Sequence, residues 1–225
     1  MKSSWLVLGA VICSQLTIRT SAADLAVVVV DKEPPKAISD PIRKLLLPTA
    51  VQVIEGTAPI YQLWFASEIP LKSKPVSADK ALDTIAETTL VGAVTVGNGQ
   101  RDYKDNEIAA GDYTMRFGLQ PQDGDHLGTA DSPYFVLLIP AAGDTQLNGF
   151  ASTKAMAKVS GKDTASNHPV VLNLRSASAA GGELPKLNEP APDHKSVRVQ
   201  VPAKAGADKT AIVFELVFKG HGHIQ

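Results

Sequence analysis

Alternation of apolar and polar side chains is the feature that most constrains the fold of this chain. In residues 112–120, DYTMRFGLQ, four apolar side chains share one face of an extended chain: Tyr113, Met115, Phe117 and Leu119. The opposite face carries Asp112, Thr114, Arg116 and Gln120. A period of two is the repeat of a β-strand with one buried face, so we predict a strand here.

Similar runs, bounded by Gly, Pro and Asn, recur along the chain. The predicted strands are residues 25–30, 50–56, 61–67, 89–97, 112–120, 134–140, 170–174, 197–202 and 211–218. Two short helices are predicted as well. One covers residues 152–161, where Ser152 can cap the first turn and Gly161 can end the last, and the other covers residues 41–47. This pattern predicts an all-β fold, an antiparallel β-sandwich with one or two short helices.

The first 23 residues have the layout of a secretory signal peptide. Lys2 precedes an apolar run from Trp5 to Cys13, and small residues end the segment at Ala23. The run is shorter than the roughly 20 residues that span a bilayer, so no membrane span is predicted. A lipoprotein with lipid on Cys13 is an alternative, but the bulky Ile12 stands before that cysteine.

The only cysteine, Cys13, belongs to this leader, so the mature chain, residues 24–225, has no disulfide. That absence favours a bacterial exported protein, periplasmic or extracellular. The leader contributes Lys2 and Arg19 and no acid, so 22 basic side chains become 20 against 23 acidic ones. These charges are dispersed, which argues against nucleic acid as a partner.

We predict one domain over residues 24–225. Two stretches have the composition of linkers or arms, residues 31–41 and the Pro/Ala-rich residues 176–195.

The loop at residues 121–132 is the first candidate site, because it places Asp123, Asp125 and His126 between two apolar strands. Calcium is one interpretation, since acids and a glycine fall at EF-hand-like positions. Leu127 and Tyr134, however, stand where two further oxygen ligands are needed. Ordinary turn chemistry is another interpretation, because Asp and Gly form turns without any ligand.

Zinc or copper is the third interpretation of this loop. His126 and Asp125 are suitable ligands but too few, so a site also requires His168 or the tail pair His221 and His223. The predicted metal residues are therefore Asp123, Asp125, His126, His168, His221 and His223. This cluster forms only if the fold brings its members together.

No catalytic or nucleotide-binding motif is present, among them G-x-S-x-G, H-E-x-x-H, C-x-x-C and G-x-x-x-x-G-K-[ST]. The first hypothesis is therefore a non-enzymatic exported module that binds a small ligand or an envelope protein. A metal-binding protein or metal-dependent enzyme is the alternative. A carbohydrate-binding module is a third, but Trp64 is the only tryptophan of the mature chain and is expected in the core.

Residues 107–141 and 160–174 resemble uncharacterised exported bacterial β-sandwich proteins. Within the first segment, the turn Ala110-Gly111-Asp112-Tyr113-Thr114 is similar to the "AGxYT" entry into a hairpin in such domains. The resemblance implies an envelope location and a sandwich fold, and it implies no activity.

Overall fold

The computed structural model describes residues 24–102, 105–120, 132–162, 164, 168–179 and 182–220. Its strands are β1 (Leu25–Asp31), β2 (Thr49–Glu55), β3 (Ala58–Phe65), β4 (Ile69–Leu71), β5 (Leu90–Val96), β6 (Gln100–Arg101), β7 (Glu107–Ile108), β8 (Gly111–Leu119), β9 (Tyr134–Pro140), β10 (Val171–Ser176), β11 (Lys186–Asn188), β12 (Lys195–Ala205) and β13 (Asp208–Lys219). The helices are α1 (Asp40–Arg43) and α2 (Thr153–Ser160), with 3₁₀ turns at Ala78–Lys80, Leu82–Thr84 and Ala141–Gly143. All nine predicted strands are present, and the mostly-β prediction is confirmed.

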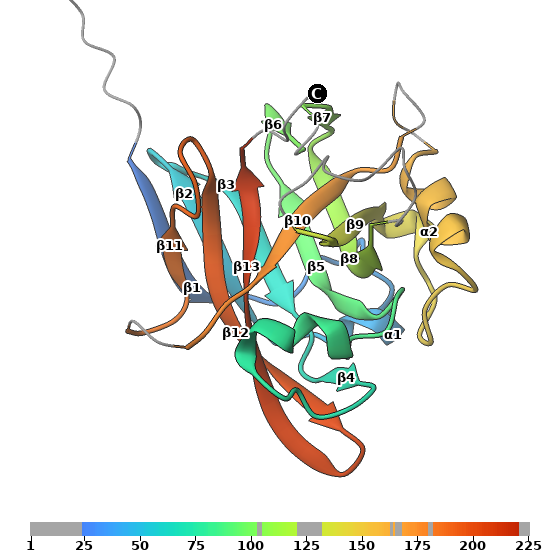
Figure 1. Cartoon of the computed structure of the whole chain (residues 1–225). Helices are drawn as coiled ribbons and strands as arrows, with labels where there is room; N and C mark the ends of the chain where they lie inside the picture. The colour runs from blue at the N-terminus through green and yellow to red at the C-terminus, as the bar shows by residue number, and fades with distance from the viewer. Residues whose placement is uncertain are drawn as a thin grey trace, which may run out of the picture.

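The long strands belong to one curled sheet in the order β1-β2-β3-β5-β8-β9-β10-β13-β12-β11 (Figure 1). Every neighbouring pair in this order is antiparallel, whereas β4 pairs with β12 in parallel. The sheet is therefore mixed. The short strands β6 and β7 pair with each other.

The main core lies inside the curl, where the apolar faces of distant strands meet. Tyr61 on β3 contacts Phe218 on β13 with ring centroids 5.8 Å apart. Phe65 meets Phe214 edge to face at 5.9 Å, again between β3 and β13. These two strands are far apart in the sheet order, so the rings pack across the curl and not along the sheet.

The alternation of β8 places its side chains as predicted. Met115 and Phe117 are fully buried in the main core. Arg116, on the opposite face, is also buried, because the chain around the turn Ala141–Gly143 covers that face. The outer face of the sheet is therefore covered here as well as the inner one.

The segment 31–41, for which the sequence indicates a linker or an arm, packs on the sheet as an arm. Ile38 and Ile42 are buried against Trp64 and Ala93 on the outer face of the sheet. The indole of Trp64 donates a hydrogen bond to the backbone oxygen of Lys32 at 2.7 Å. Two isoleucines among prolines and charges are sufficient to anchor this segment.

Helix α2 agrees with its prediction. The Ser152 side chain accepts a hydrogen bond from Ala155 N at 3.1 Å, and Gly161 follows the last turn. Met156 packs onto Leu137 and Ile139 of β9. The helix thereby covers the outer face of β9.

The helix predicted at residues 41–47 is only the four residues of α1. Its i→i−4 bonds give way to i→i−3 bonds at Leu45 and Leu46. Leu46 then bridges to Ala66, and Leu47 N donates to Phe65 O at 2.9 Å. Pairing with the end of β3 therefore replaces the helix.

The loop predicted at residues 176–195 contains a strand. Leu187 of β11 pairs with Val197 of β12, and this short strand ends the sheet. No described helix is both long and apolar enough to cross a membrane.

Candidate functional site

The two ends of the sheet, β1 and β11, approach each other, so the curl nearly closes (Figure 1). β11 pairs only with residues 196–198 of β12, and β4 pairs with residues 203–205 on the same edge. Among the described residues, β12 has no strand partner at positions 199–202 on the side away from β13. The closure is therefore incomplete along part of the seam.

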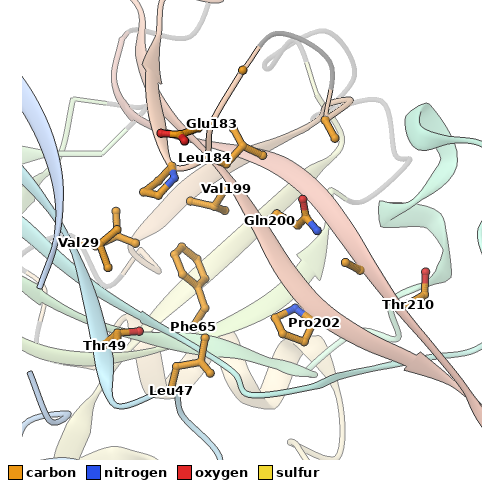
Figure 2. A pocket seen from close by; sticks show the side chains of 15 residues that line it. Val29, Leu47, Thr49, Phe65, Glu183, Leu184, Val199, Gln200, Pro202 and Thr210 are labelled. Carbon is orange, nitrogen blue, oxygen red and sulfur yellow. The ribbon is translucent and has the colours of Figure 1, made fainter. Parts of the chain in front are cut away.

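A cavity of about 620 Å³ opens at this gap, and we call it the seam pocket. Val29, Thr49 and Val51 of β1 and β2 form one wall, and Val199, Gln200 and Pro202 of β12 form the other (Figure 2). Phe65 lies between these walls, and Glu183 and Leu184 lie at one end. The pocket is thus built from segments at the two ends of the chain.

The pocket has an apolar interior and a sparse polar rim. Val29 is 54% exposed, an unusual exposure for a valine whose side chain faces the inside of the curl. Phe65 is buried by its packing on Phe214 and presents its ring to the cavity. Glu183 is the one ionisable side chain among the described residues that line the pocket. Such a lining can bind an apolar body and orient a polar or cationic group.

Backbone groups also face the pocket, beginning with β1. Gly56 N donates a hydrogen bond to Asp24 O, and Lys32 N donates one to Pro48 O, both at 3.2 Å. The backbone N–H and C=O groups of the even-numbered residues of β1 therefore point towards β2. The direction of the backbone N–H and C=O groups alternates from one residue to the next along an antiparallel strand. The N–H and C=O of Val29 therefore point away from β2 and face the pocket.

The same argument applies to β12. Ala177 N donates to Val213 O at 3.3 Å, so the carbonyl of Val213 points towards β10. Gln200 is paired with Val213 in the β12–β13 ladder. The N–H and C=O of Gln200 therefore point away from β13, into the pocket.

Of the six predicted metal residues, His168 alone is among the described residues. Asp123, Asp125, His126, His221 and His223 lie outside the described residues. His168 is exposed beside the turn after α2, where its backbone oxygen accepts a hydrogen bond from Thr164 Oγ1 at 2.9 Å. Within the described part of the chain, no group of three or more His, Cys, Asp or Glu side chains is placed to hold a metal ion.

The most polar cluster of the interior surrounds Arg116. Asp144 accepts from Arg116 Nε at 2.8 Å and Nη2 at 3.0 Å, and from Thr114 Oγ1 at 2.5 Å. The guanidinium also donates to the backbone oxygens of Thr88 and Gln146. These groups are already bonded within the protein. The cluster therefore holds the segment around Ala141–Gly143 against β8.

Sequence reasoning did not find the seam pocket, because strand alternation does not show which two strands end up opposite each other. Two prolines carried a usable signal. Pro202 within a predicted strand and Pro185 just before β11 each lack an N–H, and proline in a sheet is typical of an unpaired edge. Together they mark the edge of β12 that the pocket occupies.

No protein-family model, curated protein or solved structure matches the chain.

Proposed function

We propose that this protein is an exported, non-enzymatic binding module whose ligand occupies the seam pocket. The observation that carries this proposal is the 620 Å³ opening between β1 and β12, lined by Val29, Val51, Phe65 and Val199. Its volume is in the range of protein ligand sites, about 300–1,000 Å³. Binding explains why apolar side chains stand open to solvent at the seam.

The chemistry of the pocket favours binding over catalysis. Acid–base catalysis needs titratable groups placed at the reacting atoms, commonly an acid and a base. Glu183 is the only ionisable residue among the described lining residues, and Thr49, Gln200 and Thr210 are neutral. We infer an apolar ligand with at least one polar group near Glu183.

Export and the sandwich arrangement belong to the same proposal. The signal-peptide layout of residues 1–23 supports export to a bacterial periplasm or to the medium. The contacts of Tyr61 with Phe218 and of Phe65 with Phe214 support two packed layers, as in a sandwich. A metal site at His126 is a separate proposal, for which elemental analysis of the mature protein is the test.

Nile red, a neutral apolar dye, tests the pocket in the mature protein, residues 24–225. We expect saturable fluorescence enhancement that is weakened about tenfold in Val29→Gln, which puts an amide into the pocket. Val28→Gln is the matched control, because it changes the neighbouring residue on the opposite face of the same strand. Equal affinity in both variants, or no binding to the unmodified protein, would contradict the proposal.

A further inference from the structure

We propose that the occupant of the seam pocket is an extended polypeptide segment, which adds as a strand between β1 and β12. This inference rests on the proposed function and specifies its ligand class. It starts from the position of β11, which pairs with β12 and also approaches β1. At that end of the seam, the space between β1 and β12 is filled by one strand.

Within the part of the chain that the structure describes, no segment continues this strand along the pocket. The ladder between β11 and β12 begins at Lys186, opposite Arg198. If this ladder continued in the same register, Pro185 would lie opposite Val199 and Leu184 would lie opposite Gln200. Pro185 has no N–H to donate on the side of β1, and residues 183–185 line the pocket at one end. Since no described strand takes the position beside residues 199–202 of β12, this position can accept another chain.

The open position offers backbone hydrogen bonds on both sides. Val29 presents an N–H and a C=O from β1, and Gln200 presents the same pair from β12. Pro202 presents only a carbonyl, which limits the paired length to about four residues, or ~13 Å of strand. A strand running in the direction of β11 would be antiparallel to both neighbours, because β1 and β12 run in the same direction.

The side chains of the pocket specify an alternating partner sequence. Inward-facing positions of an added strand would meet Phe65, Val51 and Leu47, so they should be apolar. Outward-facing positions would lie near Gln200 and Glu183, and the carboxylate favours a basic residue there. Backbone pairing gives affinity in such complexes, while alternate side chains give specificity.

Other occupants satisfy fewer of these groups. A compact apolar molecule would cover the N–H and C=O of Val29 and Gln200 without bonding to them, which is costly. A folded strand from a second copy has one edge already bonded, so it cannot pair on both sides. β1 itself is such a strand, since its other edge is bound to β2. The partner is therefore a segment that is not part of a sheet before it binds.

The test uses ¹⁵N-labelled mature protein and the blocked peptide acetyl-Val-Lys-Val-Lys-Val-Lys-amide. At a peptide concentration about ten times its Kd, we expect amide exchange at both Val29 and Gln200 to slow roughly tenfold. The control peptide has the same side chains but N-methyl groups on alternate amides, which blocks pairing along one edge. Because this control peptide loses a few backbone hydrogen bonds, it should bind at least about tenfold more weakly.

A variant separates strand pairing from simple filling of the pocket. Val29→Pro removes an N–H that faces the pocket and no bond of the β1–β2 ladder. We expect it to weaken binding of the unmodified peptide about tenfold, and to change binding of the N-methylated peptide, whose pairing along one edge is already blocked, by much less. Its melting temperature shows whether it folds, and the N-methylated peptide gives the same comparison on the unmodified protein.

The outcomes distinguish the two proposals. Nile red binding without protection of Val29 and Gln200 by the peptide would overturn the strand proposal and leave the binding proposal intact. Failure of both ligands would overturn both. Protection of the two amides without peptide, together with a dimer in gel filtration, would identify a second copy as the occupant and contradict the proposed partner.

Discussion

Arg116 lies on the outer face of β8, where alternation places polar residues, yet its side chain is only 1% exposed and that of Asp144 is 0% exposed. Asp144→Ala would leave the guanidinium buried without its anionic partner. We expect the free energy of unfolding to fall by about 3–5 kcal/mol in denaturant titration. Asp40→Ala is the control, since it breaks an exposed pair with Arg43 and should change stability by less than about 0.5 kcal/mol. Similar losses in both variants would refute a structural role for the buried pair.

Two tyrosines should ionise late when the folded protein is titrated with base. Loss of solvation, and then the hydrogen bond to Asp83, raise the pKa of Tyr134 to about 12. Burial, and then the charge of Asp102, also raise the pKa of Tyr61 above its usual value. A raised pKa stabilises the fold fully below the unfolded value of about 10, and this contribution is lost as pH rises through the folded value.

Absorbance of tyrosinate, recorded on native and on urea-unfolded protein, measures this difference. We expect Tyr134→Phe to remove an ionisation step near pH 12 from the native titration. Four tyrosines that all titrate near pH 10 in the native protein would contradict the burial of Tyr61 and the hydrogen bond of Tyr134 to Asp83.

At the scale of elements, α2 depends on its N-terminal cap. Ser152→Ala removes the acceptor for Ala155 N, and we expect a loss of about 1 kcal/mol in the free energy of unfolding. Ser152→Asp keeps an acceptor and should stay close to the unmodified protein in the same thermal or denaturant titration. An unchanged stability in the alanine variant would mean that packing of Met156 on β9 alone holds the helix.

The nine long strands could be predicted because each has its own apolar pattern. The short strands were not predictable in this way. β11 is three residues inside a segment rich in Pro and Ala, and its pairing depends on β12 rather than on its own sequence. The packing of segment 31–41 was hard to predict for a related reason, since only Ile38 marks it as a packed element before α1 begins.

At the scale of the whole molecule, the sequence did not indicate how the sheet curls. The pairing of β10 with β13 and the packing of Phe65 on Phe214 join residues that are far apart in the chain. The seam pocket depends on both, because Val29 and Val199 face each other across the cavity only when the curl is complete. The predicted metal residues illustrate the same limit, since convergence of His126 with His168 is a property of three dimensions and not of spacing.

The order of strands in the sheet has a consequence for how the protein folds. β2, β3, β5, β8, β9 and β10 each pair with the preceding long strand, so each step closes a comparatively short loop. The pairing of β13 with β10 skips β11 and β12, and it attaches the hairpin of β12 and β13, whose own pairing is local in the sequence. Since sheets built from local pairings fold faster than those built from distant ones, we expect this attachment to come late. The pocket would then arise in the final step, and a folding intermediate that lacks this step would not compete for the ligand.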